Sequence, residues 1–284
     1  MSKQNVAIIV DSTAYLPQNI IEKHNMHVIP LNLLWGGKSY RDNVDITAVE
    51  FYKQLQTAKE MPTTSQPSPG DFHELFEKVA ETAESIVCLT ISQPLSGTYA
   101  SAVAARNMMD DFPIEIVDSR SAVMGLGFQA IAAAEAAEAG ATYKEAAEAA
   151  RAIIPAVHVN FVVDTLEFLH RGGRIGGASR YIGTMLSIKP ILTIENGKIE
   201  AVDKVRTKKK AIAKILDMTE ADLKGKSKFR IAVQNAATPE EGNQVTEEVK
   251  KRFGLDNVIQ SDISPVIGAH TGPGAVATIY YVEP

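Results

Sequence analysis

The chain has 284 residues, of which 45% are hydrophobic and 22% are charged. That composition is typical of a folded globular protein and excludes intrinsic disorder, collagen-like repeats and a coiled coil. The formal net charge of −5 argues against a protein whose main task is to neutralise a nucleic-acid backbone. One cysteine, Cys88, excludes an internal disulfide and a zinc site built on paired thiolates.

The N-terminus reads MSKQNVAIIVDST. Its short apolar run lacks the length of the core of a secretory signal. No segment approaches the roughly 20 apolar residues that a membrane-spanning helix needs. We therefore expect a cytoplasmic globular protein.

In the first half, short β-branched runs alternate with amphipathic or alanine-rich stretches. Strands are predicted over 6–10, 28–33, 86–91 and 114–117, with helices near 17–24, after the cap Ser68, from about Gly97 and near Ser121. This alternation predicts a doubly wound, mostly parallel sheet. The alanine- and glutamate-rich stretch 129–154 is broken at Gly140 and restarted by a Thr142–Glu145 capping box, and it ends the first domain.

The second half of the chain has a different pattern of predicted strands and helices. Asn196-Gly197 between two apolar runs predicts a hairpin with a type I′ turn. Helices are predicted near 207–222 and 238–253, the latter capped by Thr238, and strands near 229–234, 257–263 and 276–282. We expect two domains: an N-terminal α/β domain over 1–157 and a smaller C-terminal α/β (α+β) domain over 158–284.

Small hydroxyl residues recur at the ends of the predicted strands. They occur in the segments 11–13, 62–68, 92–98 and 118–121. One such loop is typical of an ordinary turn. Because ligands of open parallel sheets bind outside the carboxyl ends of the strands, four loops predict a polar rim around a bound molecule.

Ser96-Gly97-Thr98 follows a strand and begins a helix. The unpaired N–H groups at a helix start favour an anion, and Gly97 would let that anion approach the backbone. The alternative is that Ser96 only caps its own helix.

Two further segments are rich in glycine. His270 lies in His270-Thr271-Gly272-Pro273-Gly274, a predicted loop where its imidazole could donate to a carboxylate, act as a base or simply bond to the backbone. Arg174 lies in a glycine-rich turn from which it could reach a carboxylate, or tie the two domains together. No second histidine or cysteine stands at metal-ligand spacing from His270.

A basic cluster marks the start of the helix predicted near 207. It comprises Lys204, Arg206, Lys208, Lys209, Lys210 and Lys214. No aromatic residues are interleaved with it, as nucleic-acid binding would favour. A solvated helix face is the common explanation, and a docking surface for an acidic protein partner is the alternative.

The same residues allow a hydrolase, with Ser96 as nucleophile, His270 as base and Asp118 or Asp11 as the orienting acid. The sequence lacks the G-x-S-x-G elbow that usually presents such a serine. A covalently phosphorylated His270 is a further alternative, and it would need a phosphoryl donor site that the sequence does not display.

Taken in order, these segments resemble the DegV family of bacterial fatty-acid-binding proteins from end to end. The resemblance is carried by Asp11–Pro17, Pro30-Leu31, Tyr40–Asp42, Thr63–Ser68, Ser92–Tyr99, Asp118-Ser119, Gly125–Gly127, Leu169–Ile175, Lys189–Leu192, Val205–Lys209 and Gly268–Gly274. Each motif is weak by itself, and the order and spacing of the whole set are specific.

The resemblance implies a non-catalytic protein that holds one long-chain fatty acid between two α/β domains. Such proteins are the lipid-binding subunit of a fatty acid kinase, in which a separate ATP-binding subunit phosphorylates the carboxylate for phospholipid synthesis. The carboxylate contacts carried over are Thr64, Ser96 and His270, with Arg174 close by. Arg206, Lys208 and Lys209 would lie toward the kinase.

The resemblance also implies no cofactor other than the bound fatty acid, no nucleic acid, and at most transient membrane contact during lipid exchange. Neutral hydroxyls and backbone N–H groups can satisfy a carboxylate without a buried fixed charge. We therefore expect an apolar cavity closed at one end by uncharged donors. The motifs do not identify the residues that line the acyl tail.

Overall fold

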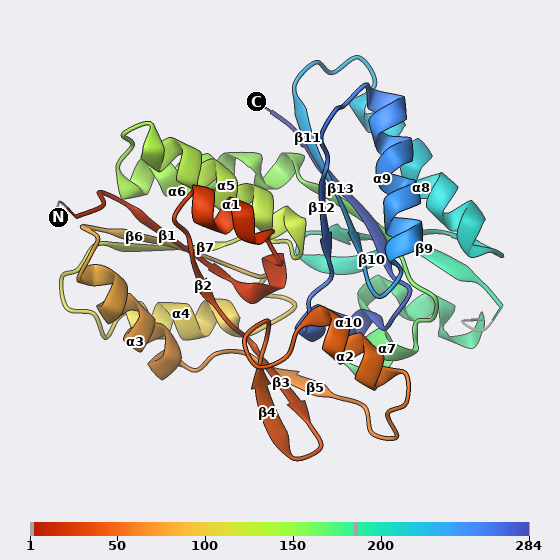
Figure 1. The fold of residues 1–284 in the computed structure, drawn as a ribbon, viewed down its shortest axis with the longest axis horizontal. Coiled ribbons are helices and arrows are strands. Elements are labelled where there is room, and N and C mark those ends of the chain that lie inside the picture. The colour runs from red at the N-terminus through yellow and green to blue at the C-terminus, as the bar shows by residue number, and fades with distance from the viewer. Residues whose placement is uncertain (1–2, 185–186, 284) are drawn as a thin grey trace.

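The computed structural model describes residues 3–184 and 187–283, and it has two halves, each built on its own sheet (Figure 1). The first sheet has the order β2 (His27–Ile29), β1 (Ala7–Asp11), β6 (Ile86–Thr90) and β7 (Ile114–Asp118). All of its strand pairs are parallel. The predicted parallel α/β sheet is thus confirmed.

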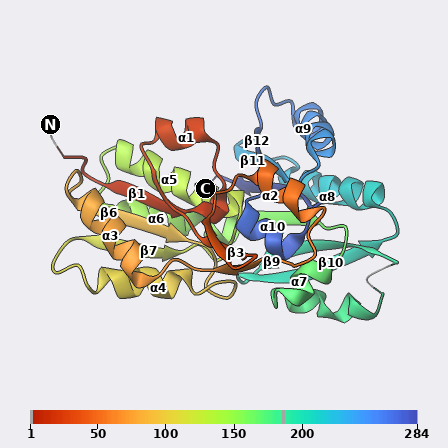
Figure 2. The same ribbon diagram turned by 60° about the horizontal axis from the view of Figure 1, so that its bottom comes forward.

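Helices cover both faces of this sheet, because alternate residues of its strands point to opposite sides. On one face lie α1 (Gln18–Lys23), α5 (Met124–Glu138) and α6 (Tyr143–Ile153), and on the other lie α3 (Pro69–Ala80) and α4 (Thr98–Arg106) (Figures 1 and 2). Ser68 and Asp71 form a capping box at α3, and Thr142 and Glu145 form another at α6, as predicted.

The predicted strand over 28–33 is wrong. The chain breaks at Pro30, and two strands belonging to different sheets result. Beyond the break, β3 (Asn32–Trp35) lies between β4 (Lys38–Arg41) and β5 (Thr63–Ser65) in a small antiparallel sheet, with α2 (Ala48–Leu55) between β4 and β5 in sequence. The Thr63–Ser65 segment therefore belongs to this sheet and not to the rim of the parallel one.

The second sheet has six strands and mixed direction. Its order is β10 (Lys198–Val205), β9 (Lys189–Glu195), β8 (His158–Val162), β13 (Val276–Val282), β11 (Phe229–Asn235) and β12 (Ile259–Asp262). Every pair is antiparallel except β11 with β12. Asn196 and Gly197 join β9 to β10 with φ of 50° and 77°, which confirms the predicted type I′ turn.

Helices α8 (Lys208–Leu223) and α9 (Pro239–Phe253) pack on the second sheet (Figure 1). The predicted cap of α9 is wrong in one respect. Thr238 occupies the cap position, but its side chain makes no capping hydrogen bond. Its N–H donates to Asn235 Oδ1, and Glu241 forms an ion pair with Lys208 instead of closing a capping box.

Short elements complete the described part of the chain. They are η1 (Ser12–Ala14), η2 (Ile154–Ala156), α7 (Glu167–Arg171), η3 (Gly176–Thr184) and α10 (Pro265–Thr271). The ring of Phe128 on α5 packs on Tyr281 of β13, with centroids 5.3 Å apart, so one core spans the junction. The division of the chain after residue 157 stays a prediction, and β8, the first strand of the second sheet, begins at the next residue.

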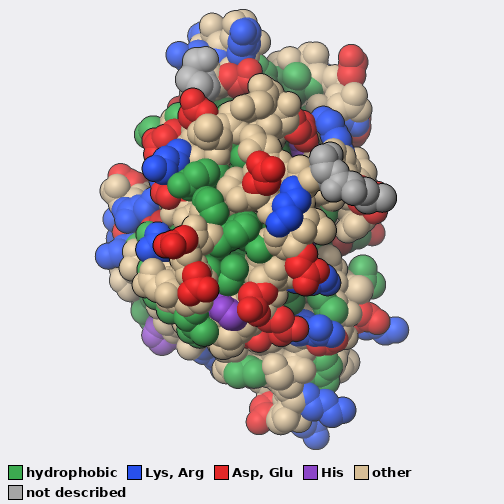
Figure 3. Space-filling view, turned by 90° about the vertical axis from the view of Figure 1, so that its left-hand side faces the viewer, with side chains coloured by type: hydrophobic (Ala, Val, Ile, Leu, Met, Phe, Trp, Pro, Cys, Tyr) green, Lys and Arg blue, Asp and Glu red, His purple; other side chains and the backbone are tan. Residues whose placement is uncertain are grey.

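On the face of the molecule at the end nearest the first sheet, acidic and basic side chains are intermingled around a band of hydrophobic ones (Figure 3). This face carries no continuous basic surface. Among the described residues, no helix is long and apolar enough to cross a membrane.

Candidate functional site

A chamber of about 280 Å³ lies between the two halves of the molecule. Its wall takes residues from β5 of the small sheet, from the loops that follow β6 and β7, and from the second sheet with α10. Its lining residues include Thr64, Gln66, Leu95, Ser96, Val159, Phe161, Arg174, Ile194, Ile199, His270 and Ala277.

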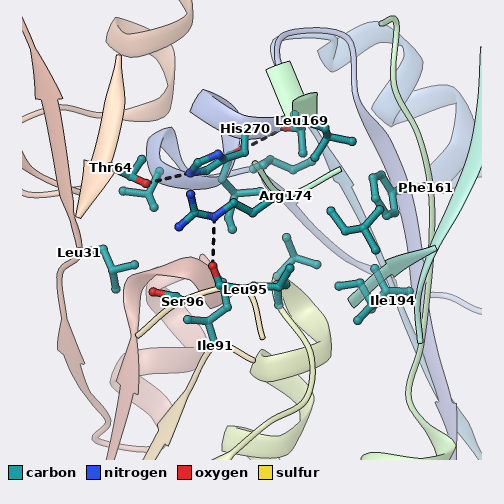
Figure 4. Close-up of a pocket in the computed structure, with 18 of the residues that line it drawn as sticks. Leu31, Thr64, Ile91, Leu95, Ser96, Phe161, Leu169, Arg174, Ile194 and His270 are labelled. Carbon is teal, nitrogen blue, oxygen red and sulfur yellow. Dashed lines mark hydrogen bonds between the residues drawn. The ribbon is translucent and has the colours of Figure 1, made fainter. Parts of the chain in front are cut away.

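One wall of the chamber is apolar and comes from the second sheet. Phe161 of β8 lies opposite Ala277 of β13, and Ile194 of β9 lies opposite Ile199 of β10. Figure 4 shows Phe161 and Ile194 on the side away from the polar residues. Sequence reasoning missed these residues. The available signal was the two-residue alternation along each strand, which places Val159 and Phe161 on one face.

The opposite end of the chamber is polar. Thr64 Oγ1 and His270 Nε2 lie 2.8 Å apart in a hydrogen bond that joins β5 to α10. Arg174 lies beside this pair, and Ser96 approaches from below it (Figure 4). The four residues carried over from the family resemblance therefore line one cavity, although they come from four separate segments of the chain.

His270 lies in the last turn of α10, and its predicted place in a loop is wrong. Burial and the nearby positive charge of Arg174 lower the pKa of His270 to about 4. The imidazole is therefore neutral at neutral pH. While Nε2 bonds to Thr64, Nδ1 is buried without a hydrogen-bond partner among the described residues.

Arg174 joins the two halves of the protein. Its Nε donates to the Leu95 carbonyl at 3.2 Å, across the junction, and its Nη1 donates to the Gly172 carbonyl at 2.6 Å. The bond to Leu95 supports the alternative in which Arg174 ties the halves together. The guanidinium also lines the chamber, and its contact with a carboxylate stays a prediction. The expectation of a purely uncharged polar end is wrong, because Arg174 brings one fixed positive charge to it.

Ser96 and Gly97 begin α4 as predicted, with Gly97 at the cap position. Ser96 Oγ lies 2.8 Å from Thr98 Oγ1, so the Ser96 side chain helps to close the helix start and also lines the chamber. Gly97 itself is not one of the described residues that line the chamber. A Cβ at residue 97 would lie 2.3 Å from Gln66 Oε1, so the glycine makes room for this amide.

The predicted four-loop polar rim is wrong for two of its loops. Asp11 Oδ1 accepts from the Thr13 N–H, and Ser12 Oγ donates to Asp42 Oδ2 at 2.7 Å. Ser119 Oγ donates to the Ser121 carbonyl. The Ser119 hydroxyl holds its own loop, the Ser12 hydroxyl holds the segment around Asp42, and neither lines the chamber.

The hydrolase arrangement is not assembled. Ser96 Oγ bonds to Thr98, while His270 Nε2 bonds to Thr64. Asp118 accepts from the N–H groups of Gln93 and Arg120, and Asp11 is used inside its loop. The nucleophile, base and acid that the mechanism needs do not bond to one another.

The basic cluster divides into inward and outward side chains. Lys208 Nζ forms ion pairs with Glu241 at 2.5 Å and Asp164 at 3.4 Å, so this lysine stabilises the second domain and is not a free docking charge. Arg206 and Lys209 are exposed. Within residues 3–184 and 187–283, no group of three or more His, Cys, Asp and Glu side chains could hold a metal ion.

The fold and the chamber together have the form of an α/β ligand-binding protein, with the ligand space at the junction of two sheets. The sequence profile of the DegV family, a family of proteins described as uncharacterised, matches residues 5–283. The chain belongs to the DegV family.

Relatives are similar over almost the whole chain. A DegV domain-containing protein of Streptomyces coelicolor is 40% identical over 97% of this chain and 98% of its own length. The solved structure of a fatty-acid-binding DegV family protein from Thermus thermophilus is 33% identical with a TM-score of 0.92, covering 98% of this chain and 100% of that one. DegV of Bacillus subtilis, a fatty acid binding protein, is 33% identical with a TM-score of 0.92, covering 99% and 100%.

Proposed function

We propose that this protein binds one long-chain fatty acid in the chamber, with the acyl tail against Phe161 and Ile194 and the carboxylate at Thr64, Ser96 and His270, beside Arg174. The observation that carries this proposal is the chamber itself, which is apolar along one wall and has four polar side chains at one end. Two relatives that are described as binding fatty acids, each 33% identical to this chain, support it.

The acyl tail and the carboxylate of the ligand contribute differently to binding. Burying about 15 methylene groups offers roughly 12 kcal/mol before the costs of association. The tail therefore supplies most of the affinity, and the polar end orients the carboxylate. Its hydroxyls and imidazole carry no charge at neutral pH, and the guanidinium of Arg174 is already bonded to two carbonyl oxygens. The carboxylate is thus held without a dedicated ion pair and stays nucleophilic.

We further propose that a separate, ATP-binding kinase subunit phosphorylates the presented carboxylate, so that this protein is the non-catalytic subunit of a cytoplasmic fatty acid kinase that feeds phospholipid synthesis. A carboxylate oxygen attacks the terminal phosphorus of the nucleoside triphosphate. The new C–O–P anhydride forms as the bond to the bridging oxygen breaks, and the nucleoside diphosphate leaves with that electron pair. The exposed Arg206 and Lys209 support a docking surface for the acidic partner.

Solvent extraction of the purified protein, followed by lipid mass spectrometry, tests the binding step. A long-chain fatty acid at about one molecule per chain is expected. The variant Ala277→Phe fills the apolar wall opposite Phe161, and it should lower fatty acid affinity at least tenfold while the protein stays folded by circular dichroism. Unchanged affinity in a folded Ala277→Phe protein would place the acyl chain elsewhere.

The docking step needs a different measurement. Arg206→Gln combined with Lys209→Gln should reduce acyl-phosphate formation with the kinase subunit and leave fatty acid affinity unchanged. The control is Lys144→Gln, an exposed lysine on α6, which should change neither. Equal acyl-phosphate formation by the double variant and the wild type would contradict this docking surface.

A further inference from the structure

A second hollow, of about 210 Å³, lies against the polar end of the chamber. Thr64, Arg174 and His270 line both spaces. The rest of the second hollow, here called the outer hollow, includes Arg171 and Gly172 from the end of α7 and the segment that leads into β5. A group bonded to a carboxylate at Thr64 and His270 would therefore lie next to the outer hollow.

The outer hollow is positively charged. Arg171 and Arg174 line it, and no aspartate or glutamate does so among the described residues. Arg174 is held by the carbonyl oxygens of Leu95 and Gly172, which leave its charge in place. Arg171 forms an ion pair with Glu167 at 2.6 Å, one helical turn away. That pair is half-exposed, so it contributes little and a stronger anion can replace it.

His270 also has an unused atom close to the outer hollow. Its Nδ1 is buried without a partner among the described residues, and it lies over Gly172. A Cβ at residue 172 would lie 2.1 Å from Nδ1, so only glycine can lie against this edge of the ring. A buried, unpaired nitrogen is costly, and a ligand that bonds to it removes that cost.

We propose that the outer hollow is the binding site for the phosphoryl group of the long-chain acyl phosphate, with Arg171 and Arg174 as its cations. This inference rests on the proposed function. A phosphoryl group carries about 1.5 to 2 negative charges and three acceptor oxygens, whereas a carboxylate carries one charge. Arg174 is the one fixed cation among the described lining residues of the chamber, and Arg171 of the outer hollow adds the second charge that the phosphoryl group requires. Planar guanidinium groups match phosphate geometry in two-point contacts.

The proposal predicts a difference between two ligands of the same chain length. The probes are palmitate and the oxoalkyl phosphonate analogue of palmitoyl phosphate, in which a methylene group replaces the bridging oxygen. Dissociation constants are measured on delipidated full-length protein. Arg171→Gln should weaken binding of the phosphonate about fivefold to tenfold, the loss of one charge-assisted hydrogen bond, and leave palmitate unchanged. Glu167→Gln frees Arg171 and should tighten phosphonate binding about twofold.

Lys144→Gln removes the same charge far from the outer hollow and should change neither dissociation constant. If Arg171→Gln weakens palmitate and the phosphonate equally, or weakens neither, the outer hollow does not bind the phosphoryl group. Failure of the wild-type protein to bind palmitate is a different result, because it would overturn the proposed function itself.

Discussion

The loop after β1 and the loop after β6 have similar sequences and opposite uses. Asp11-Ser12-Thr13 and Ser92–Gly97 both follow buried parallel strands at the same edge of one sheet. In the β1 loop the polar atoms are used by the scaffold: Asp11 accepts from the Thr13 N–H and hydroxyl and from the N–H of Ile91, which follows β6. In the β6 loop Ser96 faces the chamber. A turn hydroxyl is available to a ligand only when the fold leaves it facing a cavity, as Ser96 does while it bonds to Thr98.

Asp11 of the β1 loop and Asp42, which follows β4, are as buried as any core residue. Burial raises the pKa of Asp11 to about 6 and that of Asp42, the partner of Ser12, to about 7. The chamber's polar end contains hydroxyls, an imidazole and a guanidinium, and no carboxylate among its described lining residues. The β1 loop therefore stabilises the fold. The polar end of the chamber has no carboxylate among its described lining residues that would repel a bound anion.

The largest expected effect belongs to the β1 loop. Asp11→Ala removes the acceptor of three hydrogen bonds and leaves buried donors unpaired, at about 1 to 3 kcal/mol each. The free energy of unfolding in urea should fall by at least about 3 kcal/mol. Asp118→Ala, which removes a more exposed carboxylate from the end of β7, is the control and should cost about 1 kcal/mol or less. Similar losses for both would contradict the structural role of Asp11.

Asp42 should make stability depend on pH. The pKa of Asp42 is about 7 in the folded protein, compared with its ordinary value of 3.8. The folded state therefore binds a proton at this carboxyl more tightly than the unfolded state does. The Asp42 contribution to stability is therefore fully present below about pH 4 and is lost as pH rises through 7. His270, with its lowered pKa of about 4, acts in the opposite direction between pH 4 and 6.5.

The difference between wild type and Asp42→Asn isolates the first effect. Between pH 4 and 7, the wild-type free energy of unfolding should fall relative to the variant by up to about 1.4 kcal/mol per pH unit. Asp45→Asn is the control, since the pKa of Asp45 is lowered to about 2 and its effect lies below that window. A constant difference across the window would show that Asp42 is ionised throughout.

The smallest expected change in free energy distinguishes the polar residues of the chamber from those of the β1 loop. Thr64→Val and Ser96→Ala should each reduce acyl-phosphate formation about tenfold, or about 1.4 kcal/mol, with less than about a threefold loss of fatty acid affinity. The matched control is Thr13→Val in the β1 loop, where the hydroxyl bonds to Asp11. This variant should lower stability and leave phosphorylation of the folded protein unchanged. Equal losses of binding and phosphorylation in Thr64→Val would contradict an orienting role for Thr64.

The sequence by itself determined the local elements and the fold class. Capping boxes, the Asn196-Gly197 turn and the alternation of strands with helices depend on neighbouring residues, and local physics decides them. The family resemblance also identified Thr64, Ser96, Arg174 and His270 by order and spacing. The break at Pro30 was missed because a single apolar run does not show that its two ends join different sheets.

Tertiary structure alone decided how these residues are used. Whether Ser12 or Ser96 faces a ligand depends on Asp42 and Thr98, which hold those hydroxyls through packing and, for Asp42, from a distant segment. The apolar wall depends on strand register, which pairs Phe161 with Ala277 more than a hundred residues later. Burial keeps a histidine neutral and makes two aspartates weaker acids than usual. A linear pattern contains no information on burial at that scale, because desolvation is a property of everything that surrounds the group.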